Sequence, residues 1–250
     1  MNGPESWLLS AVLVFCRVGA CFMVMPGLAS ARVPPRLRLF LAVAVSLSVG
    51  PLLREQLRPL LIAIWPVEVM ILMAREITIG LTFGLMVRMF FLALHFSAML
   101  MANIVGMAGL ITQAIDQDEQ SSPFADMVML IAVLGFFATG QHLEVVISLI
   151  SSFATLPPGR SVTSDFGIGE LTRAASTALR LALEIGAPFI VYAFVSNTLL
   201  GLANRWVPQI PVQFIATPII LVGGMSILYL LIGFMSEKFV GTFAAWMSRV

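Results

Sequence analysis

Charged residues are scarce in this sequence. Its 250 residues include 14 basic and 13 acidic side chains, or 11% of the chain, against about 25% in ordinary soluble domains. Hydrophobic residues make up 59% of the chain, and the mean hydropathy is +1.00. A soluble monomer and a disordered chain are therefore excluded. With a net charge of +1 and no basic stripe, the sequence also lacks the electrostatic pattern of a nucleic-acid binder.

Cysteine and histidine are rare as well. Cys16 and Cys21 fit neither a metal ribbon nor a redox CxxC motif, so we interpret them as small buried hydrophobic residues. His95 and His142 are isolated, and the sequence contains no HExxH, GxSxG, Walker or dinucleotide-binding motif. We therefore expect no catalytic residue, no metal site and no cofactor.

Long stretches without charge predict an all-α membrane protein. A membrane span needs about 20 apolar residues, and several stretches reach that length only by including a charge, as residues 7–28, 60–95 and 127–153 do. We expect six to eight long, partly bent apolar helices arranged as hairpins. The long stretches that contain no Asp, Glu, Lys or Arg are residues 18–31, 39–53, 89–115, 127–143, 145–159, 185–204 and 206–236.

Several details of these helices follow from local composition. We expect residues 7–28 to be a retained helix rather than a signal peptide, because Arg17 interrupts the apolar run. Residues 39–53 are short for a span and favour a re-entrant or interfacial helix. Pro218, with two glycines one turn later, predicts a bend. Connecting segments rich in proline or glycine are residues 31–38, 156–169 and 207–211.

Charges inside the apolar helices need partners, because an unpaired charge at the bilayer centre costs about 2.5–3.5 kcal/mol on insertion scales. Arg180 and Glu184 are four residues apart and are placed to pair locally, whereas Arg17 and Arg88 have no acid within four residues. The partners are then elsewhere in the fold or in another subunit, and an ion relay is a third reading. The candidate interhelical or intersubunit contacts are Arg17, Glu68, Arg75, Glu76, Arg88 and Glu184.

Small residues recur at helix-packing intervals. Gly80 and Gly84 form a GxxxG motif, and Ala98, Ala102 and Gly106 repeat every four residues, which lets another helix approach closely. The stretch that follows is rich in glycine and methionine and leads into an acidic segment. It is either a fraying helix end or a flexible apolar plug that closes a pore. The candidate plug residues are Gly106, Met107, Gly109, Leu110, Ile111 and Gln113.

The ordered residues of this sequence resemble one protein family. Arg17, Pro26, Val33–Pro34 and Arg36 are similar to its first helix and turn, and Glu76, Gly80 and Gly84 to its central helix. Ser152–Phe153 and Pro157–Gly159 are similar to its mid-chain loop. The most specific stretch contains Ala187, Pro188, Asn197, Gly201, Arg205, Pro208, Gln209 and Pro218. The chain resembles the FliR family and its virulence-secretion homologues, the single-copy subunit of the type III secretion export gate.

This resemblance implies an architecture and a function. Residues 1–178 would be built like the gate's P subunit, with a pore loop near residues 104–123, and residues 179–250 would be a hairpin like its Q subunit. One such chain joins several P and Q subunits in a hetero-oligomeric helical pore complex of the bacterial inner membrane, at the flagellar basal body. Unfolded proteins would cross this pore, which the chain helps to form and to plug.

Two other functions compete with this reading. A stand-alone secondary transporter or channel would use Glu68, Glu76 and Glu184 as ion-coupled carboxylates, but the sequence has no duplicated halves of the kind that transporters often show. An intramembrane enzyme lacks a catalytic constellation. A transporter is complete as a monomer or small homo-oligomer, whereas a gate subunit needs unlike partners.

Overall fold

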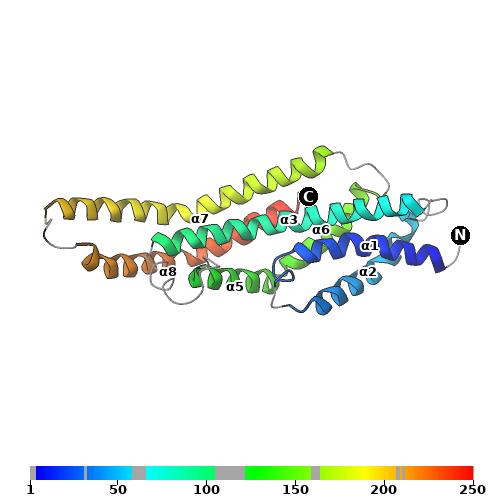
Figure 1. The fold of residues 1–250 in the computed structure, drawn as a ribbon, viewed down its shortest axis with the longest axis horizontal. Coiled ribbons are helices and arrows are strands. Elements are labelled where there is room, and N and C mark those ends of the chain that lie inside the picture. Colours follow the sequence, from blue (N-terminus) through cyan, green and yellow to red (C-terminus); the bar gives the residue numbers. More distant parts are fainter. Residues whose placement is uncertain are drawn as a thin grey trace. The chain divides into compact units, whose positions relative to one another are not determined.

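The computed structural model (Figure 1) describes residues 4–30, 33–57, 66–104, 122–158, 164–206, 209 and 212–249. In these residues every regular element is an α-helix, as the sequence predicts. The helices are α1 (Pro4–Val24), α2 (Pro35–Leu57), α3 (Pro66–Ile104), α5 (Pro123–Ala138), α6 (Gln141–Thr155), α7 (Ser164–Trp206) and α8 (Val212–Met247).

Proline sets the start of several helices. Pro35, Pro66 and Pro123 are the first residues of α2, α3 and α5. Proline suits this position because its missing N–H has no partner within the helix there and its fixed φ is already helical. α8 continues through Pro218, so the bend expected at that residue stays a prediction.

Three expected boundaries are wrong. The first helix ends at Val24 rather than at residue 28, and a turn follows in which Gly27 has a φ of 86°. The stretch 127–153 is divided, because α5 ends at Ala138 and Gly140, with a φ of 74°, precedes α6. Amino acids with a side chain rarely adopt such angles, whereas glycine does so readily. Gly140 therefore allows the chain to change direction between α5 and α6. The segment 156–169 is not all connection, since α7 begins at Ser164.

The helices form two compact units. Unit 1 contains Met1–Phe90, Gly140–Ser176 and Ala244–Val250, and unit 2 contains Phe91–Thr139 and Thr177–Phe243. The expected division near residue 178 falls inside α7. The proposed likeness of residues 1–178 to a P subunit and of residues 179–250 to a Q subunit stays a prediction.

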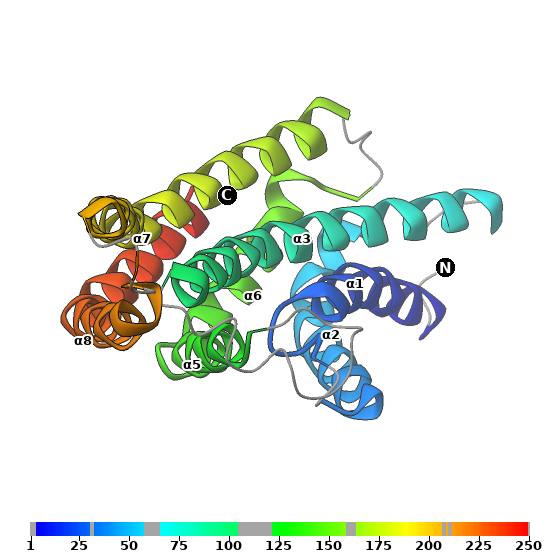
Figure 2. The same cartoon turned by 60° about the vertical axis from the view of Figure 1, so that its left-hand side comes forward.

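In unit 1, α1 lies beside α2 and against α3 (Figures 1 and 2). The glycines of the GxxxG motif face α1. A Cβ built on Gly80 would overlap the carbonyl oxygen of Arg17, and a Cβ on Gly84 would lie 2.8 Å from the carbonyl oxygen of Cys21. Both pairs are four residues apart, so one turn of α1 matches one turn of α3. Cys21 is fully buried and free, which fits the reading as a hydrophobic residue.

Unit 2 has a core of aromatic rings. Phe91 packs edge-on against Phe136 and Phe239, with centroids 5.3 Å and 5.4 Å apart, and Phe136 against Phe243 at 5.6 Å. Edge-on ring pairs add about 0.5–1.5 kcal/mol beyond the area they bury. They join α3, α5 and α8.

α7 joins α3 and α8 of unit 2 through polar groups and close contacts. The Ser97 hydroxyl donates to the carbonyl of Ala182 at 2.9 Å, and the Tyr192 hydroxyl donates to the carbonyl of Ile220 at 2.8 Å. Ala98 and Ala102 are buried on α3, so small residues again lie where helices pack.

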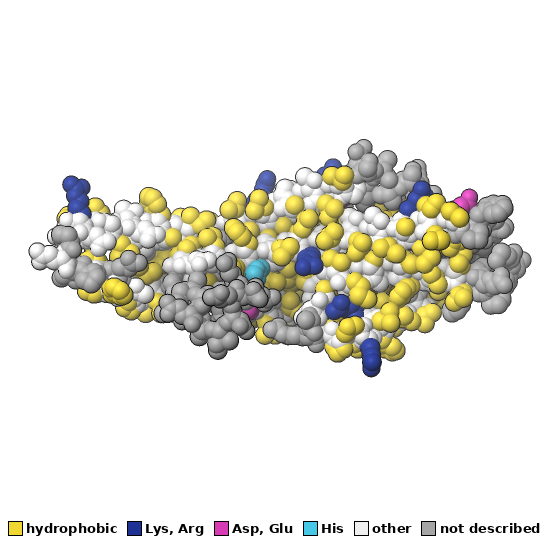
Figure 3. Space-filling view, viewed as in Figure 1, with side chains coloured by type: hydrophobic (Ala, Val, Ile, Leu, Met, Phe, Trp, Pro, Cys, Tyr) yellow, Lys and Arg dark blue, Asp and Glu magenta, His cyan; other side chains and the backbone are white. Residues whose placement is uncertain are grey.

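Within the described residues, three helices are long and apolar enough to cross a membrane. They are α3 over Val67–Ile104, α7 over Gly167–Trp206 and α8 over Phe214–Met247. The α5–α6 pair, bent by 64°, adds a fourth if it forms one span. Hydrophobic side chains are spread along the described part of the face drawn in Figure 3, and the basic ones are few and separate. The expected all-α membrane fold is confirmed.

Replacing Gly80 by alanine is expected to destabilise unit 1. The added methyl overlaps backbone that cannot rotate away, and overpacking of this kind costs about 1–3 kcal/mol. The measurement is the thermal unfolding midpoint of the detergent-solubilised chain. Gly233→Ala is the control, since a Cβ there meets nothing within 4 Å and alanine favours the helix. Equal midpoints for the two variants would contradict the close α1–α3 contact.

Candidate functional site

A buried ion pair joins α1 to α3. The Nε of Arg17 donates to Oε2 of Glu76 at 2.6 Å, and its Nη2 donates to Oε1 at 3.1 Å. The two side chains are 0% and 1% exposed. This two-bond fork matches a planar guanidinium to a carboxylate, and it neutralises both charges away from water.

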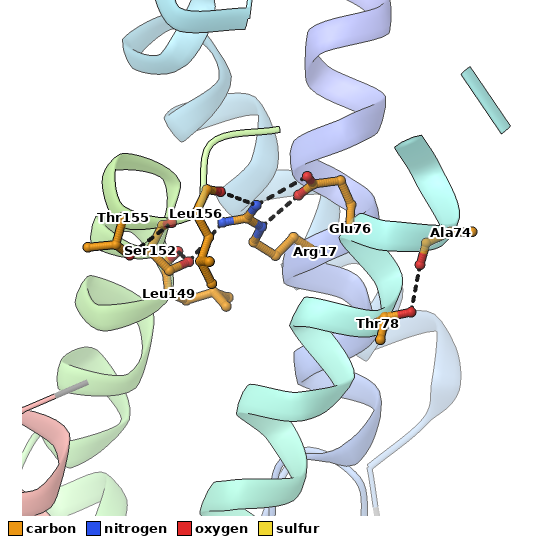
Figure 4. Close-up of polar contacts among 8 residues, drawn as sticks. All are labelled: Arg17, Ala74, Glu76, Thr78, Leu149, Ser152, Thr155 and Leu156. Carbon is orange, nitrogen blue, oxygen red and sulfur yellow. Dashed lines mark hydrogen bonds and ion pairs between the residues drawn. The ribbon is translucent and has the colours of Figure 1, made fainter. Parts of the chain in front are cut away.

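The same guanidinium reaches α6 (Figure 4). Nη1 donates to the hydroxyl oxygen of Ser152 at 2.9 Å, and Nη2 also donates to the carbonyl oxygen of Leu156 at 3.0 Å. The guanidinium carbon lies 3.7 Å from the centre of the Phe153 ring. Because the last carbonyls of a helix lack partners within it, Arg17 caps the end of α6. One side chain therefore connects three helices.

The spacing along α3 explains why this pair forms. Glu76, Gly80 and Gly84 are four residues apart and share one helix face. The glycines bring the backbone of α1 against α3, and this places Arg17 within reach of the carboxylate one turn earlier.

The other predicted charges occupy more open positions. Glu68 is exposed in the first turn of α3, where an acid interacts favourably with the helix dipole. Arg75 is half-buried and Arg88 is exposed. Glu184 of α7 pairs with Lys238 of α8 at 3.2 Å, and both side chains are about half exposed. The local partner expected for Glu184, Arg180, is therefore replaced by a lysine from the next helix.

The residues of the family motif lie on or beside the α7–α8 hairpin. Asn197, Gly201 and Arg205 are exposed on α7, and Pro218 is exposed on α8. Pro208 lies outside the described residues. So do the candidate plug residues Gly106, Met107, Gly109, Leu110, Ile111 and Gln113, and the plug stays a prediction.

Sequence reasoning gave three residues of these contacts no such role. Ser152 and Phe153 are predicted only from the family resemblance, as part of a loop, but they lie in the last turns of α6. Lys238 is the only lysine of the chain, and that rarity is the signal that singles it out. No local pattern connects Ser152 to Arg17, because 135 residues separate them.

Comparison with known proteins assigns the family. The family described as bacterial export proteins, family 1, matches residues 8–246. This chain belongs to that family. Its flagellar relatives include the flagellar biosynthetic protein FliR of Caulobacter vibrioides, which is 26% identical over 88% of this chain and 87% of its own length. FliR of Escherichia coli is 27% identical over 90% of this chain and 85% of its own length.

A relative outside the flagellar proteins matches as well. The Yop proteins translocation protein T of Yersinia pestis is 27% identical over 85% of this chain and 81% of its own length. The resemblance to the FliR family and its virulence homologues is confirmed. Together with the apolar helices, family membership identifies a multi-pass membrane protein among the bacterial export proteins.

Replacing Arg17 by alanine is expected to destabilise the chain by about 3–5 kcal/mol, because it leaves the carboxylate of Glu76 buried without a partner. The double variant Arg17→Met with Glu76→Leu removes both charges at similar volume and is expected to recover most of that loss. Thermal unfolding midpoints in one detergent measure both effects. A double variant no more stable than Arg17→Ala would contradict the assignment of the loss to an unpaired charge.

Proposed function

We propose that this chain is a structural subunit of a type III protein export gate, most closely the flagellar type, present in a single copy. It forms the pore for unfolded export substrates together with P and Q subunits and carries no catalytic activity. The observation that carries this proposal is the family match, which runs from residue 8 to residue 246. Relatives named for flagellar biosynthesis and for Yop translocation support protein export as the shared function.

The exposure of the apolar helices supports a role among other membrane proteins. α8 is the most hydrophobic of the three candidate spans. Only 6% of its apolar stretch is buried against the rest of the chain, compared with 50% in α3. Phe214, Tyr229 and Leu230 of α8 are 76–81% exposed. Since exposed apolar patches of this size mark protein or membrane contacts, lipid and neighbouring gate subunits are the surroundings that this helix requires.

The pairing of Glu76 argues against a stand-alone ion-coupled transporter. Such a protein needs carboxylates that bind and release an ion, but both oxygens of Glu76 accept hydrogen bonds from Arg17. The remaining candidates are Glu68, at the start of α3, and Glu184, which pairs with Lys238.

Deletion of the gene is expected to abolish filament assembly or effector export, because the pore lacks one of its subunits. Export substrates in the culture medium are measured beside a protein of the general secretory route, which should stay unchanged. A plasmid copy of the wild-type gene restores export. Mass spectrometry of the tagged chain, purified in mild detergent, should recover two small apolar gate proteins in fixed excess. Unchanged export after clean deletion, or recovery of the chain alone, would refute the proposal.

Removal of residues 106–111 is expected to make the assembled gate leak, if these residues plug the pore as the resemblance implies. The measurement is the conductance of the purified complex in planar bilayers, with intact subunit composition verified first. The wild-type complex with the same subunit composition is the control and should keep a low conductance. A complex that stays closed without residues 106–111 would show that the plug lies elsewhere.

A further inference from the structure

α2 has two unlike faces. Ala42, Ser46 and Val49 point toward the rest of unit 1 and are at most 6% exposed, in keeping with the packing of α2 on α1. On the outer face, Phe40 is 69% exposed and Leu47 is 46% exposed. Among the residues that the structure describes, nothing covers this apolar face.

The exposed residues form a stripe with a basic end. Arg36, Phe40, Val43 and Leu47 follow one another at intervals of four, three and four residues, so they share one side of the helix. From Phe40 to Leu47, the apolar part of the stripe, the helix rises about 10 Å, and Arg36 lies about 6 Å before it. One leaflet of a bilayer contributes about 15 Å of hydrocarbon. The apolar part therefore covers about two-thirds of one lipid acyl chain, with Arg36 at one end.

The basic end of α2 lacks an acidic partner in the described part of the chain. Its first turn holds Arg36 and Arg38 and no acid, and within the described residues neither arginine forms an ion pair with a carboxylate. Arg38 lies against the preceding turn, where its Nη2 donates to the carbonyl of Ser30 at 3.2 Å and its Nη1 lies 3.8 Å from the sulfur of Met23. Its buried Nε has no partner among the described residues. Two positive charges without an acidic partner in the described ranges thus meet the positive end of a helix dipole.

We propose that the outer face of α2 binds an anionic phospholipid. Its phosphate contacts the guanidinium of Arg36, Arg38 adds to the positive potential, and one acyl chain lies along Phe40, Val43 and Leu47. A lipid fits better than a partner helix because the stripe joins a cationic end, which suits a phosphate, to an apolar run that fits within one leaflet. This inference does not depend on the export function.

Native mass spectrometry of the full chain in detergent tests this site, with equal amounts of phosphatidylglycerol and phosphatidylcholine added. We expect about fivefold more bound phosphatidylglycerol, the preference that one arginine near a membrane surface supplies. Arg36→Gln should remove this preference and Arg36→Lys should keep most of it. Arg173→Gln is the matched control, because Arg173 is an exposed arginine on α7, and it should leave the preference unchanged. Equal binding of both lipids to the wild-type chain, or equal loss with both glutamine variants, would overturn the proposal.

Two further arms separate the lipid from other occupants. Glycerol 3-phosphate in excess should not displace phosphatidylglycerol, and full displacement would indicate a site for a free anion. Leu47→Asn should lower retention of both lipids, whereas Leu143→Asn, on an exposed leucine of α6, should not. Equal retention in these two variants would remove the acyl chain from the stripe.

Photo-crosslinking in native membranes supplies a test that needs no destabilising variant. Benzoyl-phenylalanine placed at position 40 is expected to form an adduct with phospholipid, because the ring there is exposed. A dominant adduct with another protein would assign this face to a partner subunit and overturn the lipid proposal.

Discussion

A buried guanidinium requires acceptors on every side, and in unit 1 this requirement fixes three helices. Arginine has five N–H donors and does not lose its proton in proteins. In Arg17 four of these donors are used, two toward Glu76, one toward Ser152 and one toward Leu156. A rotation of α3 by a fraction of a turn would leave two charges unpaired in the interior, and a rotation of α6 would leave two buried N–H groups of Arg17 without acceptors. The packing of α1, α3 and α6 is therefore specified by polar geometry as well as by apolar area.

The ion pair in turn depends on glycine. Hydrogen bonds of 2.6–3.1 Å form only where α1 and α3 approach closely, and at Gly80 and Gly84 the backbone of α1 lies where a side chain of α3 would be. Acid and glycines share one face of α3, so a change at Gly80 would move the carboxylate of Glu76 as well. The two sets of contacts form one cooperative unit, and their energies are not additive.

Unit 2 meets its surroundings differently. Its helices are joined by separate hydrogen bonds, such as the one from the Tyr192 hydroxyl to the carbonyl of Ile220. The ion pair of Glu184 with Lys238 is about half exposed. Apolar side chains of α7 and α8 point outward along most of their length, among them Phe194, Trp206 and Phe214 at 72–81% exposure. Exposed apolar area of this extent is stable only in lipid or against other protein. Sequence composition predicts this need, since it leaves too little charge for a water-facing surface.

Local rules predicted the helices, and long-range contacts lay beyond them. Apolar runs of about 20 residues predict the helices, because this signal lies within each segment and needs no knowledge of its neighbours. The partner of Arg17 is 59 residues away, and no spacing rule connects two helices before their packing is known. Glu184 illustrates the same limit, since the i,i+4 rule selects Arg180 while the hairpin brings Lys238 to it. A flexible lysine side chain on a neighbouring helix can therefore form the ion pair in place of an arginine on the same helix. The sequence therefore predicted that Arg17 needs a partner outside its own helix, while the choice of Glu76 depended on the close approach of α1 and α3 that Gly80 and Gly84 permit.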